Sequence, residues 1–419
     1  MTTTSWRRWA SDTWRSLDAL TDPATGLPAD HLDAALAPAS RSRYTSPTNI
    51  GGLLWCTVGA RDVGLIPSAE AVDRCRAVLA SLAGMRRHEP SGMYANWYDE
   101  ATGERLDVLP DGSVVNQFLS SVDNGWLAAG LLVVRNALPE LASDASRLLA
   151  QMDFGFFYDP DAMLLWGGHW WDADGGTRPT GHHYGHLMSE PRIASYLGIA
   201  SGRIPPEHYT RLPRERRNYR GLEVIPTWGG SMFEALMPAL LLPEVAWAPV
   251  SFGRSHANTV AAQRIFGIEE TGFGYWGFSP ASTPDGGYSE WGVEPIALSP
   301  KGYPCDVQRT GYREGRTRGW GDGVVTPHAT ALGLAVEPDE ASECLGRLER
   351  ELRCYGPGGF CDAVGVRSGR VARRYLSLDQ SMLFGALVNV LTDGALQQHF
   401  STGEVEDVLR PLITAEPAL

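Results

Sequence analysis

The chain has 419 residues, of which 43% are hydrophobic and 20% are charged, and its formal net charge is −13. This composition predicts a globular fold with a large core rather than a disordered chain. A nucleic acid or an anionic lipid surface is an unsuitable partner, because phosphate groups are bound by clustered Lys and Arg, and Lys301 is the only lysine.

The N-terminal ten residues are polar and lack the apolar stretch of a signal peptide, and no apolar run reaches the length of a membrane span. We therefore expect a cytoplasmic protein without a membrane span, or a secreted one whose leader has been removed. The six cysteines include no C-x-x-C pair, which argues against zinc and redox chemistry. No Walker, Rossmann or G-x-S-x-G motif occurs, so we expect no cofactor.

Apolar periodicity predicts twelve helical segments, separated by long loops rich in Gly, Pro and Trp. In chain order they span residues 6–20, 49–63, 69–85, 123–135, 139–152, 191–199, 232–242, 256–266, 327–336, 338–354, 378–391 and 404–410. Short extended pieces are expected around Val108 and Val224, and nothing indicates a parallel sheet.

Twelve helices in sequential hairpins can close into an inner and an outer ring. We therefore predict an all-α fold, an (α/α)6 toroid, as one domain over residues 1–419. Residues 378–391 are apolar nearly all round, which suits an inner helix. An open helical solenoid is the alternative, but no repeat of fixed period is evident.

Glu190 is the carboxylate that helix architecture explains least. It stands directly before Pro191, and proline favours the first position of a helix, so we expect a helix to start at Pro191 with Glu190 at the cap. Ser, Thr, Asp and Asn are the usual caps. A carboxylate there also gains roughly 0.3–1 kcal/mol from the helix dipole without any function. We favour function, and predict that Glu190 is a catalytic acid with a raised pKa that faces an aromatic cleft.

Five other carboxylates are candidates, and each has a structural alternative. Asp123, Glu234 and Asp379 lie in or beside capping patterns that begin at Ser120, Ser231 and Ser377. Glu290 and Asp99 lie in aromatic-flanked loops, where a solvated charge or an Asx turn is the alternative. We rank Asp123 first and Glu290 second as the partner of Glu190, and assign the other three to substrate binding.

Many of the 14 tryptophans lie in Gly-rich loops without a periodic core face, which suits stacking on the apolar faces of sugar rings. We predict that Trp276, Trp291 and at least one of Trp166, Trp170 and Trp171 line a cleft, although packing onto the scaffold is the alternative. The aromatic and histidine residues assigned to substrate binding are Trp126, Trp170, His183, Tyr184, Trp228, Tyr275, Trp276 and Trp291. His182, His183 and His186 match no metal-ligand spacing on a regular helix, so we predict no metal site.

These residues belong to motifs that occur in a known order. The motifs begin at Thr45 (TSPTNIG), Asn96 (NWYD), Ser121 (SVDNG), Met152 (MDFGF), Tyr184 (YGHLMSE), Gly230 (GSMFE), Thr326 (TPHA) and Tyr375 (YLSLDQ). With them the chain resembles the bacterial glucoamylase-like domain of β-1,2-glucan-degrading enzymes and cyclic β-1,2-glucan synthases. The resemblance covers most of the chain. It implies an (α/α)6 barrel, inverting hydrolysis of β-1,2-glucan as in glycoside hydrolase family 144, and an acidic pair at Glu190 and Asp123.

The sequence therefore favours a glycoside hydrolase that acts on β-1,2-linked glucan or an oligoglucoside. Glu190 would protonate the leaving oxygen, and Asp123 or Glu290 would activate water. A transglycosylase or a hydrolase of another β-glucoside is the alternative among enzymes. A carbohydrate-binding protein that has lost its chemistry is the alternative outside that class.

Overall fold

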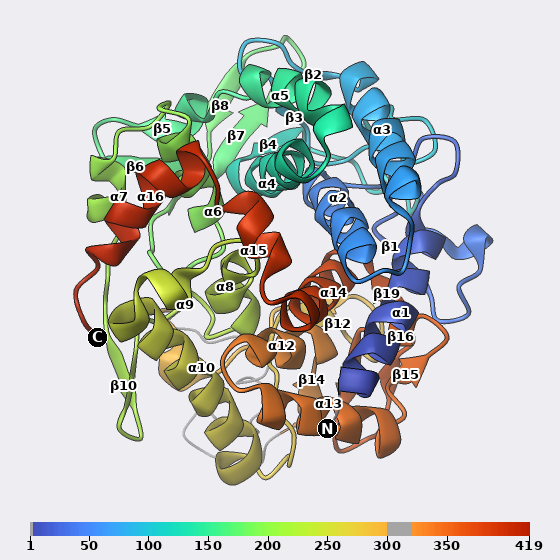
Figure 1. Ribbon diagram of the computed structural model, residues 1–419, viewed down its shortest axis with the longest axis vertical. Helices are drawn as coiled ribbons and strands as arrows, with labels where there is room; N and C mark the ends of the chain where they lie inside the picture. The colour runs from blue at the N-terminus through green and yellow to red at the C-terminus, as the bar shows by residue number, and fades with distance from the viewer. Residues whose placement is uncertain (1–2, 300–320) are drawn as a thin grey trace.

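Helices dominate the computed structural model, which describes residues 3–299 and 321–419 (Figure 1). The helices are α1 (Thr3–Leu20), α2 (Pro47–Asp62), α3 (Ser68–Gly84), α4 (Ser121–Ala137), α5 (Ala142–Gln151), α6 (Arg192–Ala200), α7 (Glu207–Arg211), α8 (Met232–Leu236), α9 (Glu244–Trp247), α10 (Arg254–Arg264), α12 (Pro327–Leu332), α13 (Pro338–Arg350), α14 (Ser377–Thr392), α15 (Ala395–Phe400) and α16 (Glu404–Thr414). Each of the twelve predicted helical segments coincides with one of these. Periodicity missed α7, α9 and α15, because four to six residues are too few to display it.

The helices pack in two groups. In the first group α2 contacts α4 and α14, α4 contacts α6, and α12 contacts both α8 and α14. In the second group α1 packs on α14, α3 on α2, α5 on α4, α10 on α8 and α13 on α12, and these helices lie at the periphery in Figure 1. Helix α14, which is close to the C-terminal end of the chain, thus packs against both α1 and α2. This contact brings the two ends of the chain into one core.

Glycines allow the helices of the first group to touch through their backbones. A Cβ added at Gly51 on α2 would lie 2.3 Å from the carbonyl oxygen of Trp126 on α4, and one at Gly130 would lie 2.5 Å from the carbonyl oxygen of Gly51. A Cβ at Gly125 would lie 3.1 Å from Ala194 on α6. The spacing of α2, α4 and α6 therefore requires glycine at these positions.

The loops contain more extended structure than the sequence predicts. Among the described residues the strands are β1 (His31–Asp33), β2 (Arg87–His88), β3 (Met93–Tyr94), β4 (Phe118–Ser120), β5 (Tyr158–Asp159), β6 (Leu164–Trp166), β7 (Gly168–Trp171), β8 (Thr177–Pro179), β9 (His183–Tyr184), β10 (Arg217–Tyr219), β11 (Leu222–Val224), β12 (Ala281–Ser282), β13 (Tyr288–Ser289), β14 (Val324–Val325), β15 (Tyr355–Gly356), β16 (Gly359–Phe360), β17 (Ala363–Gly365), β18 (Val371–Ala372) and β19 (Arg374–Leu376). Strands of two to four residues show no alternation that sequence could reveal, so "all-α" was too narrow a description.

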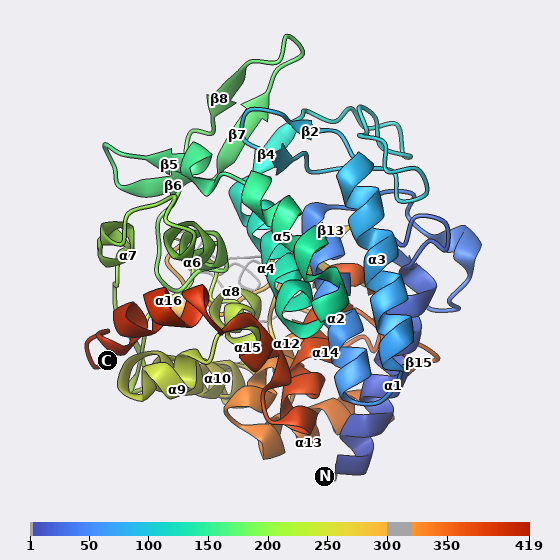
Figure 2. The same cartoon turned by 45° about the horizontal axis from the view of Figure 1, so that its top comes forward.

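The strands pair antiparallel in sheets of two or three, with orders β1-β19, β10-β11, β12-β13, β14-β17-β18, β15-β16, β2-β3, β4-β7-β8 and β5-β6-β9. The predicted extended pieces are present, since Val224 ends β11 and Val108 forms a bridge with Val114. Figure 2 shows β4 to β8 together at one end of the helices.

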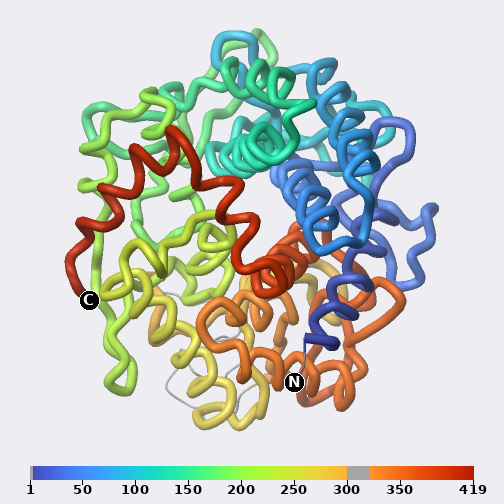
Figure 3. The backbone as a smooth tube through the Cα atoms, in the orientation of Figure 1, coloured from blue at the N-terminus to red at the C-terminus, as the bar shows by residue number. Residues whose placement is uncertain are grey.

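The C-terminal segment covers the opposite ends of the helices (Figure 3). His399 of α15 bonds to Asp62 at the end of α2, with Nε2 2.8 Å from Oδ2. Its carbonyl accepts a bond from Asn136 at the end of α4. The site described next lies at the N-terminal ends of α2, α4, α6, α8, α12 and α14, away from this cover.

One contiguous cluster contains the buried apolar side chains of the described chain, including Cys56, Cys75 and Cys344, which the sequence assigns to the core. Cys305 lies outside the described residues. No helix within residues 3–299 and 321–419 is both long and apolar enough to cross a membrane.

Candidate active site

A pocket of about 520 Å³ opens at the N-terminal ends of α6 and α8. Six predicted site residues line it, namely His183, Tyr184, Glu190, Trp228, Glu234 and Glu290. The remaining wall consists of His182, Gly185, His186, Ser189, Pro191, Phe233, Pro280 and Tyr288. The structure therefore brings together loops that are more than 100 residues apart in the sequence.

Glu190 lies in the pocket wall and does not cap a helix with its side chain. Helix α6 begins at Arg192, one residue later than predicted, with Pro191 at its N-cap and no side-chain cap bond. The Oε2 atom of Glu190 is buried and receives no hydrogen bond from the described residues. Burial raises the pKa of this carboxyl well above its usual range, and the charges of Asp123 and Glu234 raise it further. Trp126 and Arg192 act in the opposite direction.

Asp123 lies in the first turn of α4, close enough to Glu190 for the two charges to interact. The backbone N–H of Asp123 donates to the Ser120 hydroxyl at 3.2 Å, so Ser120 is the predicted cap. The Oδ1 atom of Asp123 accepts a bond from the Thr48 hydroxyl of α2 at 2.6 Å. Burial raises the pKa of Asp123, although the bonds from Ser120 and Thr48 oppose this.

Glu234, in the first turn of α8, organises the loop before its helix. Its carboxylate accepts bonds from the backbone N–H groups of Trp228 at 3.1 Å and Gly229 at 3.0 Å, and from the Ser231 hydroxyl at 2.8 Å. Ser231 caps α8 as predicted by accepting from the Glu234 N–H at 3.4 Å, but its own backbone N–H donates to Thr227, so only half of the predicted capping box is formed. The bonds to the Glu234 carboxylate hold Trp228, whose ring is 48% exposed in the pocket and lies 6.1 Å from the ring of His186.

His183 and Tyr184 form the wall nearest the strands. The His183 ring stacks on Trp166 with a centroid distance of 3.8 Å, and its Nε2 lies 2.8 Å from Oδ2 of Asp159. Burial raises the pKa of Tyr184, and the charges of Glu190 and Asp123 add to the effect. Trp166 thus supports the pocket indirectly, because it stacks on His183, which lines the pocket.

Tyr288, on the β12-β13 hairpin, is a site residue that the sequence reasoning missed. Its ring is 52% exposed and lines the pocket beside Glu290. Burial of its hydroxyl, together with the charges of Asp379, Asp362 and Glu190, raises its pKa well above the usual range. The hydroxyl therefore interacts with the charge of Glu190 and with those of a second acidic cluster. The aromatic and glycine residues around Glu290 were the only signal for this hairpin.

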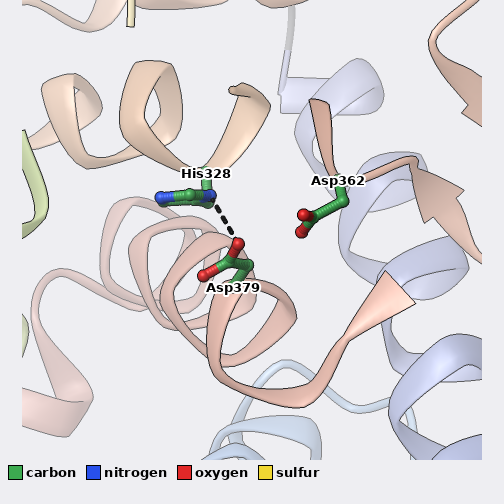
Figure 4. Close-up of side chains that lie close together, drawn as sticks. All are labelled: His328, Asp362 and Asp379. Carbon is green, nitrogen blue, oxygen red and sulfur yellow. Dashed lines mark ion pairs between the residues drawn. The ribbon is translucent and has the colours of Figure 1, made fainter. Parts of the chain in front are cut away.

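The second cluster consists of His328 on α12, Asp379 on α14 and Asp362 in the β16-β17 connection (Figure 4). All three side chains are buried, and their ligand atoms lie within 4.8 Å of one another. The predicted cap of α14 is wrong, because the N-cap residue is Leu376 and no side chain caps that helix. In the described chain, this is the group close enough to hold a metal ion, and it includes none of His182, His183 and His186.

Three predicted site residues lie outside the pocket in the packed scaffold. Trp276 is buried against Gly333, and Tyr275 donates to Glu351 at 2.5 Å under the guanidinium of Arg347. Trp291 is buried as well. The prediction that Trp276 and Trp291 line the cleft is therefore wrong. Gly-rich loops leave room for large rings to pack inward, so a non-periodic position does not imply exposure.

Asp99, Asp123, Trp126, Trp170 and Asp379 also lie outside the lining. Asp99 forms the Asx turn that was its structural alternative, with Oδ1 accepting from the N–H groups of Ala101 and Thr102. Trp170 packs on Phe118 in the β4-β7 sheet, and neither it nor Trp166 nor Trp171 is a lining residue. Trp126 is buried in α4, and its interaction with Glu190 lowers the pKa of that carboxyl.

Comparison with known proteins agrees with this arrangement. The model of the Glycoamylase family, described as putative glucoamylase, matches residues 182–404, which is more than half of the chain. The chain belongs to the Glycoamylase family. A second model, DUF3131, a family of unknown function, matches residues 8–163.

Relatives of this Glycoamylase family member include a glucan synthase. The cyclic β-(1,2)-glucan synthase NdvB of Rhizobium meliloti is 28% identical in an alignment of 315 residues that covers 72% of this chain and 10% of the synthase. The chain thus spans about a tenth of the length of this curated relative.

Two solved structures share the fold over nearly their whole length. A putative glucoamylase from Bacteroides caccae has 19% identity and a TM-score of 0.76 over 100% of both chains. The endo-β-1,2-glucanase from Chitinophaga pinensis, in complex with sophorotriose and glucose, has 18% identity and a TM-score of 0.76 over 98% of both chains.

Proposed function

We propose that this Glycoamylase family member is a glycoside hydrolase that cleaves β-1,2-linked glucan or oligoglucosides. The single observation that carries the proposal is the buried carboxyl of Glu190, which lies in a pocket wall beside two further carboxylates and has a raised pKa. Glucanase and glucan synthase names among its relatives support the β-1,2 linkage.

We infer that the fold is an (α/α)6 toroid in one domain. Contacts from α2 to α4, α4 to α6, α8 to α12, α12 to α14 and α14 to α2 support an inner ring, and the peripheral helices support an outer one. The two family models match different parts of the chain, yet α14 packs on α1 and α2, which supports a single domain.

Glu190 would act as the general acid. A carboxyl that is buried near like charges keeps its proton near neutral pH, which a general acid requires. It would donate this proton to the glycosidic oxygen as the C–O bond breaks, so that the leaving sugar departs as an alcohol. The buried Arg192, two residues later, holds the turn in place through its bond to the Ser189 carbonyl at 2.9 Å.

Asp123 and Glu290 remain the candidates for the carboxylate that takes a proton from water. Asp123 is next to Glu190 and fixed by Thr48, which favours it on preorganisation. Glu290 lines the same pocket as Glu190 and is exposed, so it has access to water. Inverting enzymes separate their carboxyl groups by roughly 6.5–9.5 Å and retaining enzymes by roughly 5–5.5 Å, so the anomeric form of the product reports on the pair in use.

Sugar rings would be held by the half-exposed Trp228 and by the hydrogen-bonding groups of His186, His183 and Tyr184. An aromatic face with polar groups around it suits a sugar, which has apolar faces and polar edges. Asp379 does not line the pocket, so its predicted contact with substrate stays a proposal.

The test is hydrolysis of linear β-1,2-glucan, with other β-glucans as controls. Glu190→Gln should lower kcat by several orders of magnitude while glucan affinity and the thermal unfolding profile stay close to wild type. Asp123→Asn and Glu290→Gln then identify the second carboxylate, since only loss of the base should remove the acid limb of the pH profile. Wild-type protein that binds glucan without turning it over would instead support a carbohydrate-binding role.

Transfer to a second sugar is the alternative reaction, and the similarity to a cyclic glucan synthase favours it. Products longer than the starting oligosaccharide, formed only when acceptor sugar is added, would replace hydrolysis with transglycosylation.

A further inference from the structure

Asp362 and Asp379 are two buried acids that accept few hydrogen bonds from residues 3–299 and 321–419. Both side chains are 1% exposed. No N–H or O–H group of the described residues donates to either oxygen of Asp379 or to Oδ1 of Asp362. The remaining oxygen, Oδ2 of Asp362, accepts one bond from the Ser282 backbone N–H at 2.7 Å. Figure 4 shows the two carboxyl groups pointing into the same space.

His328 completes the cluster without supplying a positive charge. Its Nδ1 lies 3.3 Å from Oδ2 of Asp379, and neither ring nitrogen has a hydrogen bond with the described residues. Burial lowers the pKa of His328 to about 3, which favours the neutral ring.

The other charged groups around the cluster do not resolve the conflict. Arg374 favours the ionised form of Asp362, but it is opposed by Asp30, whose charge acts on Asp379. The charges of Asp362, Asp379 and Glu190 all act on the hydroxyl of Tyr288 on β13. Two carboxylates this close in a dry interior cannot both ionise at ordinary cost, so one proton or one cation must lie between them.

The donor set suits a proton better than a cation. Magnesium and calcium need about six to eight oxygen ligands, and this closed cluster offers few. A zinc-bound histidine normally passes its second ring N–H to an acceptor, and neither nitrogen of His328 has such a bond in the described chain. The N–H of Ser282 also points at Asp362, where it would repel a cation.

We propose that Asp362 and Asp379 share one proton at neutral pH and form a second acid–base pair, outside the pocket lining and separate from Glu190 and Asp123. Asp379 lies in the first turn of α14, a helix of the first group. Asp362 is a positioning residue, because its charge determines whether Asp379 is protonated. Whether the pair takes part in turnover rests on the proposed function, whereas the shared proton does not.

The proton is tested through the pH dependence of unfolding, which needs no substrate. Burial and mutual repulsion raise the pKa of both acids, so the native protein binds a proton that the unfolded chain releases above about pH 4. Stability from this source is complete below the unfolded pKa and is lost as the pH rises through the folded one. The unfolding constant of wild type should therefore rise up to about tenfold per pH unit in that window.

Asp362→Asn and Asp379→Asn should each flatten this rise above about pH 4, because an amide can bond to the remaining acid without a shared proton. Asp73→Asn, at an exposed position on α3, is the matched control and should follow wild type. If the plots of unfolding free energy against pH run parallel for wild type and both cluster variants, the proposal is overturned. It is also overturned if neither variant folds at any pH and the wild-type plot is flat.

A cation is tested in the same experiment. Millimolar Mg²⁺, Ca²⁺, Mn²⁺ or Zn²⁺, and separately a chelator, should leave the unfolding midpoint of wild type unchanged. A metal-dependent rise that Asp362→Asn abolishes would overturn the shared proton and make the cluster a metal site.

The contribution to turnover is read from the Asp362→Asn variant. If the pair serves the reaction, the variant should turn over glucan with a displaced pH profile, whereas a purely structural Asp362 would change the amount of active enzyme and leave the profile in place. An unchanged profile would confine the pair to the fold. If the protein has no turnover at all, the proposed function fails and the unfolding experiment still decides on the proton.

Discussion

Arg192 and Glu244 form a bidentate ion pair with no exposure to solvent, with Nε 2.8 Å from Oε1 and Nη2 2.9 Å from Oε2. The same guanidinium donates to the carbonyls of Ser189, Glu234 and Ala235. It therefore ties the turn that carries Glu190 to the helix that carries Glu234. The pocket wall depends on one buried cation.

Replacing Arg192 by Leu should lower the free energy of unfolding by about 3–5 kcal/mol, because the buried Glu244 would lose its guanidinium partner and keep only its bonds with Tyr196 and His256. Urea denaturation measures the loss. The matched control is Arg203→Leu, whose pair with Asp153 is 3.8 Å long and half exposed, and which should change stability by less than about 1 kcal/mol. Equal effects of the two substitutions would contradict a scaffold role for Arg192.

The pH profile of turnover should report on Glu190. Because a general acid must be protonated, kcat/KM should fall as the pH rises through the Glu190 pKa. The Asp123 charge helps to raise that pKa, so residual activity of Asp123→Asn should decline at a lower pH than wild type does. Asp73→Asn should leave the profile in place. A shift to higher pH in Asp123→Asn would contradict the assigned coupling.

Trp228 and Trp276 should behave oppositely on truncation. Trp228→Ala removes a half-exposed ring from the pocket and should raise KM by about two- to tenfold with little change in stability. Trp276→Ala leaves a cavity against Gly333 and should cost about 3–5 kcal/mol of stability. Steady-state kinetics and thermal unfolding of both variants measure this split, and a KM effect for Trp276 without loss of stability would reverse the assignment.

His328 should make the protein sensitive to acid. Its pKa is lowered to about 3 by burial, so below the ordinary histidine value of about 6.5 the unfolded chain binds a proton that the native state refuses. This source costs about 1.4 kcal/mol per pH unit as the pH falls. His328→Asn should reduce the slope of unfolding free energy against pH in this range, while the acid sensitivity due to His169 persists. An unchanged slope would mean that His328 is protonated in the native state.

The sequence allowed prediction of the features that depend on local patterns. Apolar runs marked α4 and α14, and the Glu190-Pro191 step placed a carboxylate at the start of α6 within one residue. Ser120 and Ser231 acted as caps as predicted. These features need only neighbours along the chain.

Features set by contacts between distant segments were not predictable in the same way. Trp276 looked exposed because its loop is Gly-rich, but Gly333, far along the chain, provides the space that buries it. Tyr288 reaches the pocket only because its hairpin folds over the helices. Asp362 did leave a signal, since an acid within the apolar run FCDAV is costly to bury without a purpose.

The glycine contacts between α2, α4 and α6 have an electrostatic consequence. Thr48, Asp123 and Glu190 stand at the starts of these helices, so the width of the helix backbones fixes how far apart the three groups lie. In a medium of effective dielectric about 20, moving two charges from about 4 to about 5 Å apart changes their interaction energy by roughly 0.8 kcal/mol, or about 0.6 pKa unit. Adding one methyl group at Gly51 or Gly125 would thus change the pKa of Glu190 without replacing any polar atom. The glycines of the helix contacts therefore help to set the acidity of Glu190.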